Sequence, residues 1–166
     1  MSQSTGTMLA ELLGKALLLS GHKLVTAESC TGGGLAYNIT SIAGSSQWFE
    51  RGFITYSNES KQQLLGVPAE ILETFGAVSE QTATAMAQGA IDNSHAEISV
   101  AITGIAGPDG GTKEKPVGTV CLAWSIREGE TKATQVVFDG DRQRVREQAI
   151  LIALQGLLDL TKANNS

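Results

Sequence analysis

The chain has 166 residues, enough for one domain with a buried core, and its 42% hydrophobic and 17% charged residues are ordinary for a globular protein. A net charge of −5 argues against nucleic acid or an anionic membrane as a partner. The two cysteines form neither a metal-ligand spacing nor a disulfide framework, and no apolar stretch is long enough to span a bilayer. We therefore expect a single cytoplasmic domain over residues 1–166.

Helices and strands alternate along the chain when hydrophobic periodicity and turn residues are considered together. Helices are expected over about residues 8–19, 35–42, 68–76, 80–91 and 142–160, with one more short helix beginning at 58 or 60. Strands are expected over 24–28, 52–56, 98–102, 117–126 and 133–138. The last two strands are joined by a short turn, which predicts an antiparallel hairpin. The pattern predicts a three-layer α/β/α fold with a mixed, mostly parallel sheet of about five to six strands.

Three of the predicted strands end in polar or glycine-rich sequence, at Ser29, Tyr56 and Thr103. Ligands of open α/β sheets bind at the carboxyl ends of the strands. We therefore expect these three strand ends to converge on one pocket.

The segment ESCTGGG, residues 28–34, places Ser29 at a turn from a strand into a helix. Backbone N–H groups at such a helix start can hold an oxyanion or a phosphate, and glycines let a ligand approach the backbone closely. A tight turn followed by a helix that Thr31 or a neighbour caps explains the same residues equally well. The segment lacks the spacing of a Walker loop, of a dinucleotide-binding fingerprint and of the α/β-hydrolase nucleophile motif.

A serine nucleophile requires a base, and the chain offers few candidates. His22 and His95, the two histidines, fall in predicted surface turns at helix ends. Lys61 lies shortly after the second predicted strand, and a lysine that loses solvation can become neutral enough to accept a serine proton. By composition alone, a solvated lysine on a short helix is the commoner situation.

Two further segments carry candidate ligand contacts. The glycine-rich turn over residues 103–115 suits either close approach of a ligand or simply an irregular loop. Arg142 stands at the start of the last predicted helix, where its guanidinium could bind a phosphate or carboxylate. Alternatively, Asp141 caps that helix and its arginines are solvated.

Seven segments resemble one family when they are taken in order: TAESCTGG (26–33), IAGSS (42–46), RGFITYSN (51–58), GAVSE (76–80), TGIAGPDGG (103–111), KPVGTV (115–120) and GDR (140–142). The resemblance is to the stand-alone nicotinamide-nucleotide amidases, which correspond to the C-terminal domain of CinA proteins. It covers the chain from about Leu9 to Leu160.

The resemblance implies deamidation of nicotinamide mononucleotide to nicotinate mononucleotide and ammonia, a recycling step in pyridine nucleotide metabolism. It implies a mechanism without metal or other cofactor, with Ser29 as nucleophile, Lys61 as base and Tyr56 as a further site residue. The substrate-binding positions that it implies are Thr31, Gly32, Gly33, Asn58, Thr103, Gly104, Ile105, Ala106, Gly107 and Arg142. Of these, the positions over 31–33 would form the turn around the reacting carbonyl.

Two other functional classes stay open. Some CinA-type domains lack activity, so a catalytically silent nucleotide-binding or regulatory module is the alternative. A thiol hydrolase using Cys30 is the other, although neighbouring residues at a strand end point to opposite sides, so only one of Ser29 and Cys30 can face the pocket. Family members often form dimers, which leaves a homodimer open. The sequence does not rank nicotinamide mononucleotide against its riboside or free nicotinamide.

Overall fold

The computed structural model describes residues 4–165. Its helices are α1 (Thr5–Ser20), α2 (Gly34–Thr40), α3 (Asn58–Leu65), α4 (Ala69–Phe75), α5 (Glu80–Asp92) and α6 (Arg142–Asn165), with a short 3-10 helix, η1 (Ser45–Gln47). Its strands are β1 (Leu24–Glu28), β2 (Phe49–Ile54), β3 (Ile98–Gly104), β4 (Thr119–Ile126) and β5 (Thr131–Val137). Each predicted helix and strand is present, whereas η1 was not predicted.

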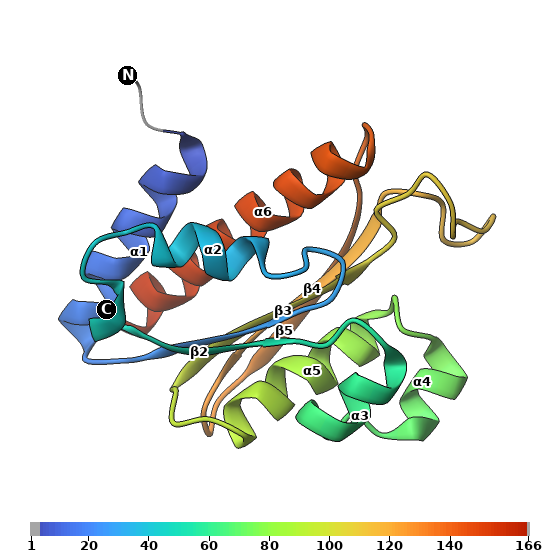
Figure 1. Cartoon of the computed structure of the whole chain (residues 1–166). Helices are drawn as coiled ribbons and strands as arrows, with labels where there is room; N and C mark the ends of the chain where they lie inside the picture. Colours follow the sequence, from blue (N-terminus) through green and yellow to red (C-terminus); the bar gives the residue numbers. More distant parts are fainter. Residues whose placement is uncertain (1–3, 166) are drawn as a thin grey trace.

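The strands form one five-stranded sheet in the order β2-β1-β3-β4-β5 (Figure 1). β1 lies parallel to both β2 and β3, whereas β4 pairs antiparallel with β3 and with β5. The mixed sheet and the predicted hairpin are therefore confirmed, and β4 is the strand that runs against the other four. Because β1, β2 and β3 are parallel, their carboxyl ends lie at the same edge of the sheet.

Helices cover both faces of the sheet (Figure 1), which confirms the predicted three layers. α1, α2 and α6 pack on one face around a core that includes Leu13, Ile39 and Leu154. α5 packs on the other face, with α3 and α4 against it, and Met86 lies in that core. With both faces covered, all five residues of β1 are buried. This burial holds the end of β1, and hence Ser29, in a fixed position.

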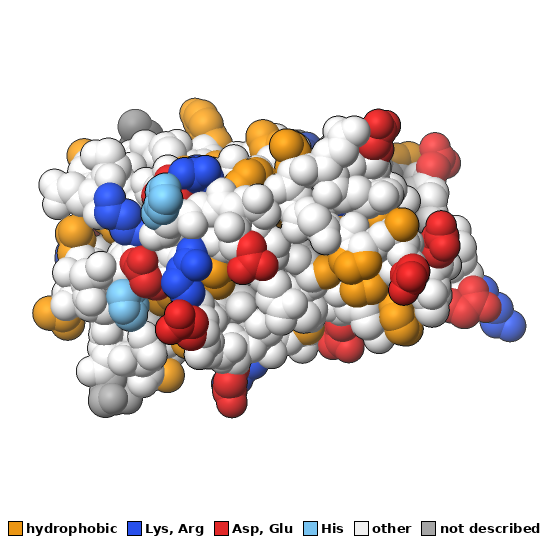
Figure 2. Space-filling model, turned by 90° about the horizontal axis from the view of Figure 1, so that it is seen from below, with side chains coloured by type: hydrophobic (Ala, Val, Ile, Leu, Met, Phe, Trp, Pro, Cys, Tyr) orange, Lys and Arg blue, Asp and Glu red, His pale blue; other side chains and the backbone are white. Residues whose placement is uncertain are grey.

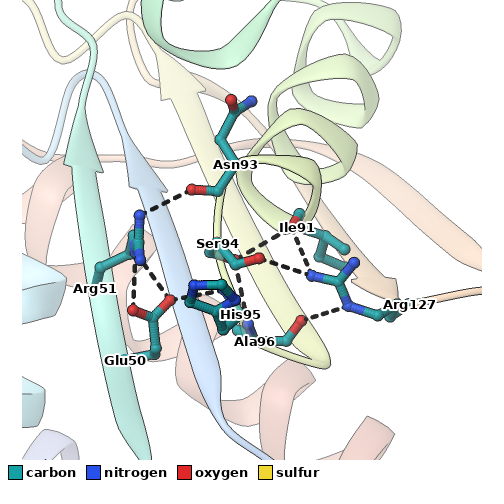
Figure 3. A network of polar contacts seen from close by, with 8 residues as sticks. All are labelled: Glu50, Arg51, Ile91, Asn93, Ser94, His95, Ala96 and Arg127. Carbon is teal, nitrogen blue, oxygen red and sulfur yellow. Dashed lines mark hydrogen bonds and ion pairs between the residues drawn. The ribbon is translucent and has the colours of Figure 1, made fainter.

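A polar network lies at the end of the sheet where β1 and β3 begin (Figure 3). The Arg127 guanidinium donates hydrogen bonds to three carbonyl oxygens of the segment 91–96, at 2.7 to 3.0 Å. The Glu50 carboxylate accepts the His95 backbone N–H at 3.0 Å and is paired with Arg51 at 2.8 Å. The network satisfies carbonyls at the end of α5 and ties the turn after this helix to the sheet.

Both histidines lie at this same end of the sheet, because His22 precedes β1 and His95 precedes β3. Figure 2 shows histidine side chains beside intermixed basic and acidic side chains. β1 has five residues, and a strand rises about 3.3 Å per residue, so His22 is separated from Ser29 by the whole length of the strand. Neither histidine is placed to act as a base for Ser29.

Candidate active site

Ser29 lies directly after β1, in a tight turn that leads into α2. Its backbone N–H donates a hydrogen bond to the Ile102 carbonyl at 2.9 Å, so the turn begins beside β3. Its carbonyl accepts the Gly32 N–H at 3.0 Å, which closes the turn. Gly32 and Gly33 have φ values of +58° and +101°, in the left-handed region that glycine adopts without strain. Gly32 and Gly33 of the ESCTGGG segment are therefore required by the turn itself.

Glu28, the last residue of β1, caps α2 from beneath this turn. One oxygen of its buried carboxylate accepts the Thr31 hydroxyl at 2.6 Å and the Leu35 N–H at 2.9 Å, and the other accepts the Ala36 N–H at 3.1 Å. Gly33 occupies the cap position and provides no side chain. Of the two positions that the sequence left open for the cap, Thr31 or a neighbour, the structure places the neighbour Gly33 there, and Thr31 instead donates to the Glu28 carboxylate. The sequence did contain a signal for this role of Glu28, because it is an acidic residue shortly before a helix whose cap position has no side chain.

The segment after β2 brings Lys61 to the nucleophile turn. The Thr55 N–H donates to the Glu28 carbonyl at 2.8 Å, which extends the pairing of β2 with β1 by one residue. α3 begins three residues later, at Asn58, so Lys61 lies in its first turn. The helix therefore starts beside the turn that holds Ser29.

The amine of Lys61 lies in hydrogen-bond contact with Ser29. Lys61 Nζ donates to Ser29 Oγ at 3.1 Å, to the Thr55 carbonyl at 3.0 Å and to the Tyr56 carbonyl at 3.2 Å. The Lys61 side chain is only 1% exposed, and within residues 4–165 no carboxylate is among the hydrogen-bond partners of its amine. Burial lowers the pKa of Lys61 below its ordinary value of 10.5. The site therefore favours the neutral amine more than solvent does.

A cavity of about 260 Å³ opens at this edge of the sheet, where the three predicted strand ends meet. The predicted site residues that line it are Ser29, Tyr56, Asn58, Lys61, Thr103, Gly104, Ile105, Ala106, Gly107 and Arg142. Thr31, Gly32 and Gly33 do not line it, because they form the part of the turn that leads away into α2. Residues that line the cavity without having been predicted as substrate contacts are Cys30, Ala77, Val78, Asp109 and Gly110.

Arg142 and Tyr56 form one rim of the cavity. Arg142 Nη2 donates to the Tyr56 hydroxyl at 3.2 Å, and Nη1 donates to the Gly107 carbonyl at 2.8 Å. The Tyr56 side chain is 64% exposed, and Arg142 is exposed as well. A cationic group is therefore available to a ligand at the mouth of the cavity, and it is not among the causes of the lowered pKa of Lys61.

The end of β3 and the loop after it form another part of the cavity wall. The Thr103 hydroxyl is buried and donates to the Ala77 carbonyl at 2.8 Å, so it supports the wall. Gly104 packs against β4 so closely that a Cβ there would lie 2.8 Å from a methyl group of Val120 and 2.9 Å from the Thr119 carbonyl oxygen. The absence of a side chain at Gly104 thus allows the loop to leave the sheet at this point.

Cys30 is the neighbour of Ser29, and its thiol is held in the un-ionised form. Burial raises the pKa of Cys30 to about 11, and the residue is only 6% exposed. The Lys61 amine contacts Ser29 Oγ, and no hydrogen bond of this amine to Cys30 is present in the described chain. These contacts favour the serine over the thiol as the nucleophile.

Within residues 4–165, no group of three or more His, Cys, Asp or Glu side chains is placed to hold a metal ion. None of the helices in that range has the length and apolar character needed to cross a membrane.

The fold and the site define an open α/β domain with a buried Ser–Lys pair at the carboxyl ends of its parallel strands. Residues 6–161 match the family described as "CinA C-terminal domain", and the chain belongs to this family.

Proteins of known name are similar to the chain over most of its length. It is 53% identical over 157 residues to "Nicotinamide-nucleotide amidohydrolase PncC" of Escherichia coli (strain K12), a match that covers 95% of each chain. It is 49% identical over 154 residues to the protein of the same name from Pseudomonas putida, covering 93% of this chain and 96% of that one. A longer relative, a "CinA-like protein" of Akkermansia muciniphila, is 51% identical over 137 residues, which make up 33% of that protein.

The fold agrees with that of a solved structure. The competence/damage inducible protein CihA from Agrobacterium tumefaciens superposes with a TM-score of 0.93 at 45% sequence identity, covering 96% of this chain and 98% of that chain.

Proposed function

We propose that this chain is a nicotinamide-nucleotide amidase that hydrolyses the carboxamide of nicotinamide mononucleotide to nicotinate mononucleotide and ammonia. The observation that carries the proposal is the 3.1 Å contact between Lys61 Nζ and Ser29 Oγ on a cavity wall. The names of relatives that share about half of its residues support the same class of reaction. A buried lysine beside a serine is one pairing that can activate a hydroxyl for attack on an amide without an external activator.

The partners of Lys61 Nζ fix the direction of its lone pair. A neutral amine has two N–H bonds and one lone pair. The Thr55 and Tyr56 carbonyl oxygens can only accept hydrogen bonds, so they take the two N–H groups. The remaining position faces Ser29 Oγ, whose hydroxyl can then donate to the lone pair. Deprotonation of Lys61 therefore converts the contact into one that is poised to remove the serine proton.

The reaction balances with these two side chains and one water. Lys61 takes the proton of Ser29, and Oγ attacks the carboxamide carbon to give a tetrahedral intermediate. The C–N bond then breaks, and protonated Lys61 returns its proton to the departing nitrogen, so ammonia leaves and an ester of Ser29 remains. Water attacks the ester as Lys61 accepts its proton, and that proton returns to Oγ when the C–O bond to the enzyme breaks.

The oxyanion and the phosphate would bind at different parts of the cavity. We assign the oxyanion to the backbone N–H of Cys30, the residue that follows the nucleophile and lines the cavity. We assign the substrate phosphate to Arg142 at the mouth, with Asn58 and the segment 103–107 around the nucleoside. Thr31, Gly32 and Gly33 then act on the shape of the turn and do not contact the substrate.

A substrate panel tests the proposal. The purified chain is incubated with nicotinamide mononucleotide, with its riboside and with nicotinamide, each with and without a chelator, and ammonia and the acid product are measured. We expect equimolar ammonia and nicotinate mononucleotide, unaffected by the chelator, with free nicotinamide the poorest substrate. Binding of the nucleotide without ammonia release would establish the silent module instead. Loss of activity with the chelator would contradict the metal-independent mechanism.

A further inference from the structure

Arg146, another arginine of α6, lies one helical turn beyond Arg142. Residues four apart lie on the same helix face, so Arg146 points toward the same side as Arg142. α6 lies beside α2 (Figure 1), and the turn that carries Ser29 leads directly into α2. Arg146 is half-buried and does not line the cavity, so it reaches the site from behind the turn.

In the part of the chain that the structure describes, the two hydrogen bonds of the Arg146 guanidinium are with the backbone of the nucleophile turn. Its Nε donates to the Cys30 carbonyl at 3.1 Å, and its Nη2 donates to the Thr31 carbonyl at 3.3 Å. The two carbonyls belong to successive peptide units, and the planar guanidinium meets them with two of its fixed N–H groups. The guanidinium therefore constrains the orientation of both peptide planes at once.

The turn needs such a constraint. It is closed by the hydrogen bond from the Gly32 N–H to the Ser29 carbonyl, and it continues through Gly33. Both glycines have positive φ, and glycine is the residue with the most freedom to leave its conformation. Rotation of the peptide plane of the Cys30 or the Thr31 carbonyl would move Ser29 Oγ relative to Lys61 Nζ. The proton transfer depends on the distance between these two atoms.

We infer that Arg146 is a positioning residue: by bonding the Cys30 and Thr31 carbonyls it holds the turn in the orientation that directs Ser29 Oγ at Lys61 and the Cys30 N–H at the oxyanion. It contacts neither the substrate nor the reacting atoms. Two arginines on one face of α6 thus have different roles. Arg142 binds the substrate phosphate at the mouth of the cavity, and Arg146 holds the turn behind the nucleophile. The inference rests on the proposed function, because its kinetic test measures amide hydrolysis.

The test compares Arg146→Gln and Arg146→Lys with a matched control, Arg144→Gln, at an exposed arginine two residues earlier on the same helix. Arg146→Gln should lower kcat for nicotinamide mononucleotide by about tenfold to a hundredfold, with KM within about twofold, because a misplaced nucleophile affects chemistry more than binding. Arg146→Lys should recover part of the loss, since one ammonium can replace only one of the two bonds well. Arg144→Gln should match wild type.

Amide hydrogen exchange at Gly32 gives a second readout that does not depend on activity. We expect faster exchange in Arg146→Gln than in wild type and in Arg144→Gln, because the turn opens more often. A raised KM with unchanged kcat would overturn the inference by making Arg146 a substrate contact. Unchanged kcat and unchanged exchange would overturn it as well. If wild type released no ammonia, the proposed function would be contradicted but the inference about Arg146 would not. The exchange rate at Gly32 would still decide whether Arg146 holds the turn.

Discussion

Replacing Lys61 with methionine removes the proposed base while filling nearly the same buried space. The structure allows the cost to be estimated. The substitution leaves the carbonyls of Thr55 and Tyr56 without their amine donor, which destabilises, but it also removes an ammonium group from a side chain that is only 1% exposed. These two effects oppose each other, so we expect the free energy of unfolding to change by no more than about 2 kcal/mol.

The effect of Lys61→Met on activity should be far larger than its effect on stability. Loss of a general base lowers kcat/KM by about a thousandfold or more, equivalent to about 4 kcal/mol of transition-state stabilisation. Lys61→Arg keeps the charge but cannot deprotonate usefully, so it should be nearly as inactive. The assay is ammonia release from nicotinamide mononucleotide, with thermal unfolding as the check on folding. An arginine variant that kept more than about a tenth of the wild-type rate would refute the role of Lys61 as a base, since an electrostatic role alone would suffice.

The lowered pKa of Lys61 predicts how both kcat/KM and the free energy of unfolding change with pH. Because burial lowers the pKa of Lys61, kcat/KM should fall as the pH drops through that lowered value, where the amine gains its proton. For stability, the folded chain binds fewer protons than the unfolded chain between the lowered pKa and the ordinary value of 10.5. Wild type should therefore gain stability relative to Lys61→Met as the pH rises through that window, and the charged amine should cost stability below it. A difference in unfolding free energy that did not change with pH would contradict the lowered pKa.

Three further substitutions separate substrate binding, chemistry and folding. Arg142→Lys should raise KM for nicotinamide mononucleotide by about tenfold, because a point charge cannot reproduce a two-pronged contact with phosphate, while the riboside should be less affected; equal KM values would remove the phosphate from this site. Cys30→Ala should stay within about fivefold of the wild-type rate, since a buried thiol with a raised pKa contributes packing, and a complete loss would move the nucleophile to the thiol. Arg127→Met should lower the free energy of unfolding by about 2–3 kcal/mol with kcat unchanged, because it leaves carbonyls unpaired at the far end of the sheet, and a lowered kcat would show that the two ends are coupled.

The order of helices and strands could be predicted because periodicity and turn residues mark most of them clearly. β1 and β3 are short apolar runs, and the β4–β5 hairpin is bounded by an obvious turn. The start of β2 was predicted three residues too late and its end two residues too late, since this edge strand, FERGFI, mixes charged and apolar residues and shows no clean alternation. The start of α1 was also missed, because the residues after its Ser4 cap include Gly6 and carry little helix propensity.

The site could be predicted only in part. Ser29 and Lys61 were found by the lack of usable histidines and by resemblance, but nothing in the polar helix NESKQQLL indicates that Lys61 is buried. That burial arises when α3 packs against α5 and begins beside the nucleophile turn. The cap role of Glu28 and the contact of Arg146 with the turn likewise join residues that only the folded chain brings together. A local sequence pattern cannot indicate such contacts, because the residues that make them are far apart along the chain.

Ammonia release from nicotinamide mononucleotide by wild type and by Ser29→Ala, measured under identical conditions, tests directly whether the Ser29 hydroxyl attacks the carboxamide. Ser29 is 7% exposed and lines the cavity, so the alanine variant should keep the fold, with an unfolding temperature close to that of wild type. We expect wild type to release ammonia and nicotinate mononucleotide in equal amounts and Ser29→Ala to release neither above background. A folded Ser29→Ala protein that turned over the nucleotide at a rate near that of wild type would contradict the account.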